Sequence, residues 1–216
     1  MAPATFGRPK GLRCFQFDIA NVYPNRPALA VRYAAAISFW SYVESWYANI
    51  QTALRLDLTL DDLVRFQNIR NSRRHLEELR KSAQRTLSPD RQVLFEKALE
   101  VAIEPGSERN DLVHGLSMIV NTMPDAILIV RPEHVQTLVF NTFGEVLRSG
   151  QHPTDMEKIG ADCMSHALVY RQSDFDDLVG RVKKSERLMF HLWQLCTQDT
   201  DAVGAAERAI NDLIGS

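Results

Sequence analysis

Two side chains near the middle of the chain have the types and the spacing needed for proton-transfer chemistry at a phosphate. Arg109 and His114 lie five positions apart in the run Glu-Arg-Asn-Asp-Leu-Val-His-Gly, residues 108–115. The imidazole of a histidine changes charge near neutral pH, so it can give or take a proton. An arginine stays charged and can hold two phosphoryl oxygens at once. Together they could support transesterification of RNA, in which the ribose 2′-hydroxyl attacks the adjacent phosphate.

The predicted helix that carries this pair gives the two side chains different surroundings. Ser107 is a good N-cap after a Pro-Gly pair, so we expect a helix that restarts there and continues to about Asn121. Arg109 lies at the start of its apolar stripe and in its first turn, where free N–H groups and the helix dipole favour a phosphate. At about 100° per residue, the polar face of the helix consists of Asn110, His114, Ser117 and Asn121. Asn110 could orient either catalytic group.

Metal ligands and membrane segments are not evident in the sequence. There is no tight cluster of Asp, Glu or His, and Cys163 with His166 is a lone pair without a second pair at a matching distance, so we expect no metal and no cofactor. For the other histidines we expect surface or satisfied core positions. Three scattered cysteines favour a reducing compartment. No run approaches the roughly 18 apolar residues of a membrane span, and no leader pattern is seen. We therefore expect a cytoplasmic protein without a membrane partner.

The charge of the chain is small overall but uneven. A net charge of −2 excludes a protein that coats nucleic acid through charge alone. Segment 63–91, however, contains eight basic and three acidic residues, a local balance of +5. This segment is either a solvated helix face or a track for a phosphate backbone. On the second interpretation the RNA-binding residues would be Arg70, Arg73 and Arg74, with Ser117 from the polar face described above.

Apolar periodicity predicts a mainly α fold around the candidate pair. The expected helices cover residues 27–54, 59–88, 90–103, 107–121, 173–195 and 202–214. The second begins with Thr59-Leu60-Asp61-Asp62, which has the form of a capping box. Short β-like runs are expected at 127–130, 137–140 and 167–170, and the first 26 residues are expected to form an arm without regular structure.

These elements predict an up-and-down bundle of four to five helices, with a small β-hairpin insert between the third and fourth core helices. At 216 residues, one domain is expected. Its parts would be an arm at 1–26, helices one to three at 27–123, the strand insert at 124–172 and the C-terminal helices at 173–216.

The run at 108–115 resembles the signature of the HEPN superfamily. Arg-Asn-x-x-x-His-Gly, preceded by an acidic residue and with Leu-Val before the histidine, is similar to that family's arginine followed after four to six residues by a histidine. The resemblance implies a four- to five-helix bundle, usually a homodimer with both motifs facing a shared cleft. It also implies endoribonuclease activity in toxin–antitoxin, phage-defence or RNA-processing systems, with RNA as substrate and an antitoxin or other protein as a partner. Arg109 and His114 would then be catalytic and Asn110 supporting.

Other interpretations of these residues stay open. Residues 70–75 have the same spacing, but we expect them in a mid-helix charge run outside the apolar stripe. One HEPN subgroup has a tyrosine two places after the histidine, where this chain has Leu116, so regulation through that tyrosine is not expected. An ordinary structural role would pair Arg109 with Glu104 or Glu108 and leave His114 in solvent. Many members are noncatalytic, so the alternative function is a dimerisation or protein-binding module that uses an aromatic face: Phe39, Tyr42 and Trp46.

Overall fold

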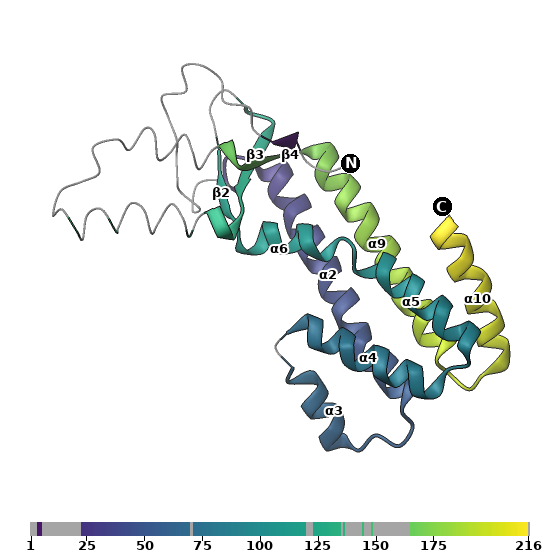
Figure 1. Ribbon diagram of the computed structural model, residues 1–216. Coiled ribbons are helices and arrows are strands. Elements are labelled where there is room, and N and C mark those ends of the chain that lie inside the picture. The colour runs from purple at the N-terminus through teal and green to yellow at the C-terminus, as the bar shows by residue number, and fades with distance from the viewer. Residues whose placement is uncertain are drawn as a thin grey trace. The chain divides into compact units, whose positions relative to one another are not determined.

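The computed structural model confirms a mainly α protein (Figure 1). It describes residues 4–5, 23–69, 71–119, 123–134, 136, 144, 148 and 165–215. By their contacts the residues divide into two compact units, one formed by Met1–Ile37 with Ser107–Val179 and the other by Ser38–Gly106 with Gly180–Ser216. The long helices α2 (Pro27–Leu54) and α9 (Gln172–Leu195) contribute residues to both units. The expectation of a single domain stays a prediction.

The first unit contains a small antiparallel sheet with the strand order β1-β4-β3-β2. Its strands are β1 (Ala4–Thr5), β2 (Leu116–Met118), β3 (Ala126–Val130) and β4 (Ala167–Arg171). At one end of the sheet three residues are in register across β2, β3 and β4, namely Leu116, Val130 and Ala167. The predicted strands at 127–130 and 167–170 are confirmed, and the run at 137–140 lies outside the described residues.

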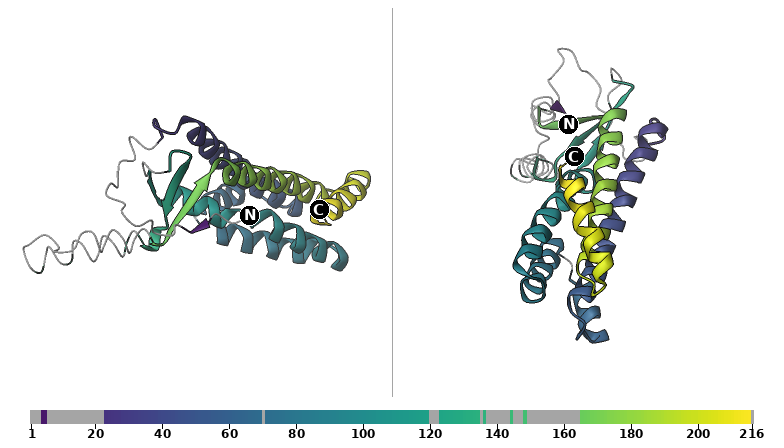
Figure 2. Two further views of the ribbon diagram at one scale, coloured as in Figure 1. Left: turned by 90° about the horizontal axis from the view of Figure 1, so that it is seen from above. Right: turned by 90° about the vertical axis from the view of Figure 1, so that its right-hand side faces the viewer.

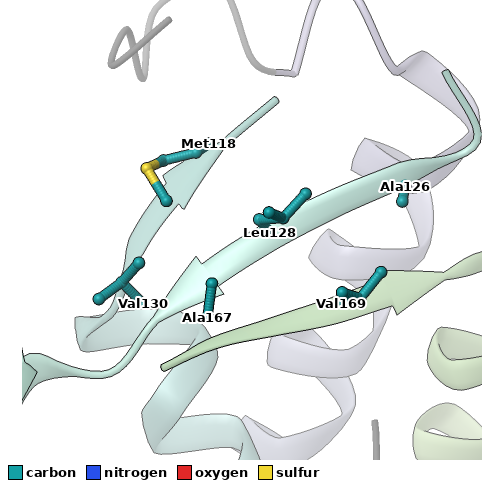
Figure 3. Close-up of a cluster of buried hydrophobic side chains, with 6 residues drawn as sticks. All are labelled: Met118, Ala126, Leu128, Val130, Ala167 and Val169. Carbon is teal, nitrogen blue, oxygen red and sulfur yellow. The ribbon is translucent and has the colours of Figure 1, made fainter. Parts of the chain in front are cut away.

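Both faces of this sheet are buried, which explains why β3 is apolar without interruption. Successive side chains of a strand point to opposite faces, so an alternating pattern is expected only where one face meets solvent. All five residues of β3 are buried. One face contains an apolar cluster of six side chains (Figure 3), namely Met118, Ala126, Leu128, Val130, Ala167 and Val169.

The predicted N-terminal arm contributes a strand to the sheet, so its assignment as irregular was wrong for residues 4–5. Ala4 pairs with Val169, and Thr5 pairs with Leu168. A two-residue strand is too short to leave a periodic pattern in the sequence, and its partner is distant along the chain. The predicted hairpin insert is therefore one part of a sheet that also includes β1 and β2.

Helix α6 (Gly106–His114) is shorter than predicted and begins differently. Glu104, at the end of the preceding helix, keeps helical dihedral angles (φ −51°, ψ −46°). The chain therefore re-enters a helix at once, and Ser107 lies inside the first turn instead of capping it. The helix ends at His114, and after a bend at Gly115 the chain forms β2 and not a further helical turn.

Gly115 is required where α6 meets the sheet. A Cβ atom built on it would collide with the Asp111 carbonyl oxygen and would lie 2.6 Å from Ile129 Cγ2 and 2.8 Å from the Val130 carbonyl oxygen. Because two of these three atoms belong to backbone, the neighbours cannot rotate away. The close approach of the chain to β3 thus explains both the glycine and the end of the helix, which apolar periodicity alone did not indicate.

The second unit is helical within the described residues. It contains α3 (Leu60–Gln67), α4 (Ser72–Thr86), α5 (Pro89–Ile103) and α10 (Thr200–Gly215), with parts of α2 and α9. Helix α5 packs against α4 and against α10 (Figures 1 and 2). The helices predicted at 27–54, 90–103, 173–195 and 202–214 are confirmed. Fully buried core residues of this unit include Val43, Ile50, Leu79, Phe95, Leu99, Leu188 and Leu192.

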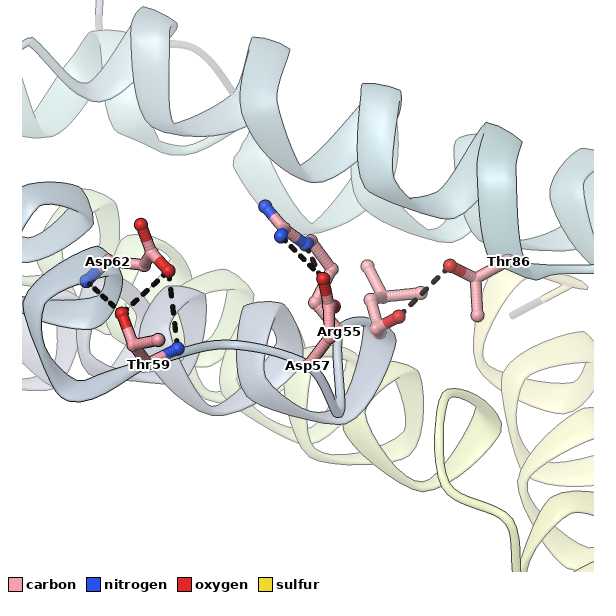
Figure 4. Close-up of polar contacts among 6 residues, drawn as sticks. Arg55, Asp57, Thr59, Asp62 and Thr86 are labelled. Carbon is pink, nitrogen blue, oxygen red and sulfur yellow. Dashed lines mark hydrogen bonds and ion pairs between the residues drawn. The ribbon is translucent and has the colours of Figure 1, made fainter.

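The predicted helix at 59–88 is in fact two helices. Its start is confirmed, because Thr59 and Asp62 cap one another reciprocally at 3.2 Å (Figure 4). Helix α3 then ends at Gln67, and Asn71 caps α4, its Oδ1 accepting a hydrogen bond from the Arg73 backbone N–H at 2.9 Å. Asparagine competes with helical hydrogen bonds in this way, and the apolar stripe on both sides of the break concealed it.

The prediction that residues 71–75 lie in the middle of a helix was therefore wrong. His75 is half-buried, and its Nε2 lies 2.8 Å from the Phe66 carbonyl oxygen at the end of α3. The imidazole also contacts the Phe66 ring, with a centroid distance of 4.8 Å. His75 thus joins the two helices instead of facing solvent.

Candidate functional site

Arg109 and Asn110 interact directly on α6. Arg109 Nη1 donates a hydrogen bond to Asn110 Oδ1 at 3.1 Å. Arg109 is half-buried, and its Nε is buried without a hydrogen-bond partner among the described residues. No salt bridge of Arg109 is found among the described residues: Glu104 pairs with Arg181 at 3.2 Å, and Glu108 lies near Tyr170. Within the described residues, the guanidinium is therefore held by a neutral amide and not by a carboxylate.

His114 is the last residue of α6 and is exposed. Five residues of a regular helix turn by about 140° and advance by about 7.5 Å, so the side chains of Arg109 and His114 leave the helix in different directions. Asn110 and His114, in contrast, are four residues apart and both exposed, which places them on one face. Because Arg109 Nη1 bonds to Asn110, the end of the guanidinium is drawn toward the face that carries His114.

A neighbouring face of α6 is attached to the sheet through polar groups. Tyr170 on β4 is fully buried, and burial together with the nearby carboxylates of Glu108 and Asp111 raises its pKa above the ordinary value. Asp111 Oδ2 forms an ion pair with Arg131 Nε at 3.0 Å, just after β3. Glu108 and Asp111 are three residues apart, so they share this face. The acidic residue before Arg109 is thus directed to the sheet.

A second tyrosine supports α6 from α2. Tyr33 Oη donates a hydrogen bond to the Leu112 carbonyl oxygen at 3.1 Å. Burial, and then the neighbouring Tyr23 hydroxyl, raises the pKa of Tyr33, while the Arg109 guanidinium acts in the other direction. Tyr33 therefore remains a neutral donor beside Arg109. The sequence does not mark Tyr33 or Tyr170 as part of a site, because each lies in an unremarkable apolar pattern far from residue 109.

Ser117 does not lie on a polar helix face, contrary to the prediction, and its role in RNA binding stays a prediction. It lies in β2 with 4% of its surface exposed. Its hydroxyl is 3.0 Å from the Tyr23 hydroxyl. The prediction depended on a helix continuing beyond His114, and the strand that replaces it turns Ser117 inward. Asn121, the last member of the predicted polar face, lies outside the described residues.

The basic segment at 63–91 is partly neutralised by its neighbours. Arg73 and Arg74 are exposed on α4, and Arg70 lies outside the described residues. Four of the basic residues form ion pairs with carboxylates, namely Arg73–Glu77, Arg80–Glu96, Lys81–Glu78 and Arg91–Glu207. Two of these carboxylates come from outside the segment, so its local charge is lower than the sequence count. RNA binding by Arg73 and Arg74 stays a prediction.

Comparisons with known proteins return no match. No family model, no curated protein and no solved structure matches the chain. In the part of the chain that the structure describes, no three side chains of His, Cys, Asp or Glu gather to hold a metal ion. None of the described helices is long and apolar enough to cross a membrane. Membership of the HEPN superfamily, which the resemblance of residues 108–115 implies, therefore stays a prediction.

Proposed function

We propose that this protein is a metal-independent endoribonuclease of the HEPN type, with Arg109 and His114 as catalytic residues and Asn110 in support. The observation that carries the proposal is the hydrogen bond from Arg109 Nη1 to Asn110 Oδ1. Asn110 shares the exposed face of α6 with His114, so this bond brings a guanidinium toward an exposed imidazole. A cation without a carboxylate partner in the described residues is suited to hold a phosphate.

The chemistry would proceed by attack of the ribose 2′-oxygen on the adjacent phosphorus. A bond from the 2′-oxygen to phosphorus forms and the bond from phosphorus to the 5′-oxygen breaks, which leaves a 2′,3′-cyclic phosphate. The attacking hydroxyl loses a proton and the leaving oxygen gains one, and His114 transfers protons in this exchange. Arg109 stabilises the charge that develops on the phosphoryl oxygens. The substrate is RNA because DNA has no 2′-hydroxyl.

The finer architecture and the biological setting belong to the same proposal. The helices would form an up-and-down bundle of four to five helices within one domain. Two copies of the chain would face each other across a shared cleft, in an arrangement with twofold symmetry. The protein would act in the cytoplasm, in toxin–antitoxin, phage-defence or RNA-processing systems, and an antitoxin would be one partner.

The test is cleavage of RNA by the purified full chain in the presence of EDTA, with analysis of the product ends. We expect cyclic phosphate ends, and a kcat at least about 100-fold lower for His114→Ala. Arg109→Lys also lowers kcat, because an ammonium cannot hold two oxygens in a fixed plane. The matched control is His191→Ala, which removes a half-buried imidazole bonded to Gln194 on α9. Full cutting by His114→Ala contradicts the assignment.

A noncatalytic interaction module is the second candidate, and an aromatic cluster of the second unit favours it. Trp46 on α2 contacts Phe190 and Trp193 on α9, with ring centroids 5.6 and 5.9 Å away. Tyr42, one turn before Trp46, is 61% exposed. This candidate predicts that clean protein leaves RNA intact. It also predicts that no growth penalty on expression depends on Arg109 or His114.

A further inference from the structure

The sheet of the first unit gathers three histidines at one of its ends. Leu116, Val130 and Ala167 form a row across β2, β3 and β4. Measured from this row along the chain, His114 comes two residues before Leu116, His134 four residues after Val130 and His166 one residue before Ala167. Because the strands are antiparallel, the starts of β2 and β4 and the end of β3 lie at the same end of the sheet. All three histidines therefore lie close to the end of the sheet at which α6 ends.

Two of these histidines form a stack. The imidazole rings of His134 and His166 have centroids 4.1 Å apart and planes that differ by 8°. His134 is half-buried and His166 is exposed. The solvent-accessible part of this two-ring stack therefore belongs mainly to His166.

The alternation of β4 points to the side of the sheet on which the stack lies. Side chains alternate along a strand, so Leu168 and Tyr170 share one face of β4, and His166, directly before the strand, would continue that face. That face also carries Ile129, which pairs with Leu168, and a Cβ atom built on Gly115 at the end of α6 would lie 2.6 Å from Ile129 Cγ2. Arg131, which pairs with Asp111, follows the last residue of β3 directly and is 45% exposed. The stack, the half-exposed side chain of Arg131 and the end of α6 thus belong to one surface.

We propose that the His134–His166 stack binds an unpaired nucleobase of single-stranded RNA beside the catalytic face of α6. Aromatic rings stack on the π-face of any base, so such a site takes single strands with little sequence preference. Arg131 pairs with Asp111 through Nε, so its Nη groups are left to donate hydrogen bonds to the phosphate next to that base. This inference rests on the proposed ribonuclease and names the place where its substrate is held.

The spacing suits a short oligonucleotide. Adjacent strands of a sheet lie about 4.8 Å apart, so β2 and β4, separated by β3, are about 10 Å apart. His114 lies two residues before β2, and His166 lies one residue before β4. A single-stranded RNA with one base on the stack can therefore present a neighbouring phosphate to His114 and to the guanidinium of Arg109.

The test is binding of labelled single-stranded oligoribonucleotides of roughly twelve nucleotides. Oligouridylate and oligoadenylate are titrated with the full chain carrying His114→Ala, so that the RNA stays intact, and fluorescence anisotropy gives Kd. We expect His166→Ala to weaken both complexes about tenfold. His166→Phe, which keeps a flat ring, stays within about twofold, and His166→Gln matches His166→Ala. His191→Ala, in the other unit, is the control and leaves Kd unchanged.

Three results would overturn the stacking site. One is an unchanged Kd for His166→Ala and His166→Gln, and the absence of any RNA binding is another. The third is a His166→Phe variant as weak as His166→Ala, since the charge or hydrogen bond of the imidazole would then hold the RNA and not its ring plane. In the cleaving protein, His166→Ala should raise KM about tenfold and leave kcat unchanged, and a fall in kcat alone would contradict a role in binding.

The two proposals fail separately. If the protein binds RNA with this dependence on His166 but does not cut it, the stacking site stands and the nuclease falls. If it cuts RNA and His166→Ala changes neither Kd nor KM, the nuclease stands and the stacking site falls.

Discussion

Two stretches of this chain carry the same pattern, Arg-Asn-x-x-x-His, and have different structures. In residues 109–114 the asparagine is exposed and holds the guanidinium before it, and the histidine is exposed at the end of α6. In residues 70–75 the asparagine caps α4. The histidine of that stretch bonds to the Phe66 carbonyl oxygen and packs beside Tyr47, with ring centroids 5.8 Å apart.

This difference shows that the spacing of the arginine, asparagine and histidine does not by itself determine the role of these residues. In the second stretch both polar side chains satisfy backbone groups of their own unit, which leaves them little capacity for a ligand. In the first, neither Asn110 nor His114 bonds to backbone within the described residues. The residue after the histidine also differs, since Gly115 lets the chain approach β3 whereas Leu76 continues α4. Four substitutions or conditions test this contrast, beginning with the largest expected effect.

Gly115→Ala should lower the free energy of unfolding by about 3 kcal/mol, because the added methyl group overlaps backbone oxygens at the junction of α6 and β2. Urea denaturation measures this loss. Gly180→Ala in α9 is the matched control, since no atom lies within 4 Å of its added Cβ, and it should stabilise the protein by about 0.5–1 kcal/mol. A Gly115→Ala variant as stable as wild type would remove the structural reason given for this glycine.

His75→Ala should cost about 2 kcal/mol of stability and leave RNA cleavage intact. The substitution removes a hydrogen bond of about 1 kcal/mol and ring contacts of similar worth between α3 and α4. Thermal and urea unfolding measure the loss. His114→Ala should show the reverse, with stability changed by less than about 0.5 kcal/mol and cleavage lost. Equal behaviour of the two variants would break the contrast between the stretches.

Alkaline pH should weaken the support of α6. The pKa of Tyr170 is raised by burial and by the carboxylates of Glu108 and Asp111, so above about pH 10 the unfolded chain loses this proton while the folded chain keeps it. The unfolded state then binds fewer protons, and stability falls as the pH rises. Between about pH 9 and pH 11, Tyr170 should account for about 1.4 kcal/mol of lost stability.

Unfolding of Tyr170→Phe over the same pH range checks this expectation, because the variant should lose less stability than wild type. Tyr42→Phe, at an exposed position, should keep the wild-type dependence. If Tyr170→Phe and wild type fall in parallel, the phenol does not stay neutral against the carboxylates of α6.

Asn71→Ala should cost about 1 kcal/mol through loss of the cap on α4, without any effect on RNA cleavage. Asn110→Ala should change stability by less than about 0.5 kcal/mol and lower kcat/KM, because Arg109 loses the partner that directs it. Circular dichroism during urea titration and a cleavage assay together separate the two asparagines. Loss of activity with Asn71→Ala would bring the second stretch back as a candidate site.

Most helices could be predicted from the sequence, because their apolar repeat and their caps are local. The capping box at Thr59 is an example, since both of its hydrogen bonds are made within four residues. The break at Asn71 was missed because an apolar stripe continued across it. Strand β2 was missed because three residues are too few to show alternation, and it exists through its pairing with β3.

The sequence also identified Arg109, Asn110 and His114 as the candidate site, since the chemistry of these side chains and their spacing can be judged without coordinates. It placed Ser117 wrongly, because the face of a residue depends on which element contains it. The stack of His134 and His166 could not be found from the sequence, as the two residues come together only through the register of β3 and β4.

For the run at 108–115, the sequence by itself determined a helix with a charged guanidinium near its start, an imidazole five residues later and a glycine after that. Only the tertiary structure decided which side chains are available. It directed Glu108 and Asp111 to the sheet and placed Tyr33 beside Arg109. It also ended α6 at the end of the sheet where His134 and His166 stack. The physical reason is that side-chain types and short-range periodicity are local properties, whereas burial, register and the choice of hydrogen-bond partner depend on distant parts of the chain.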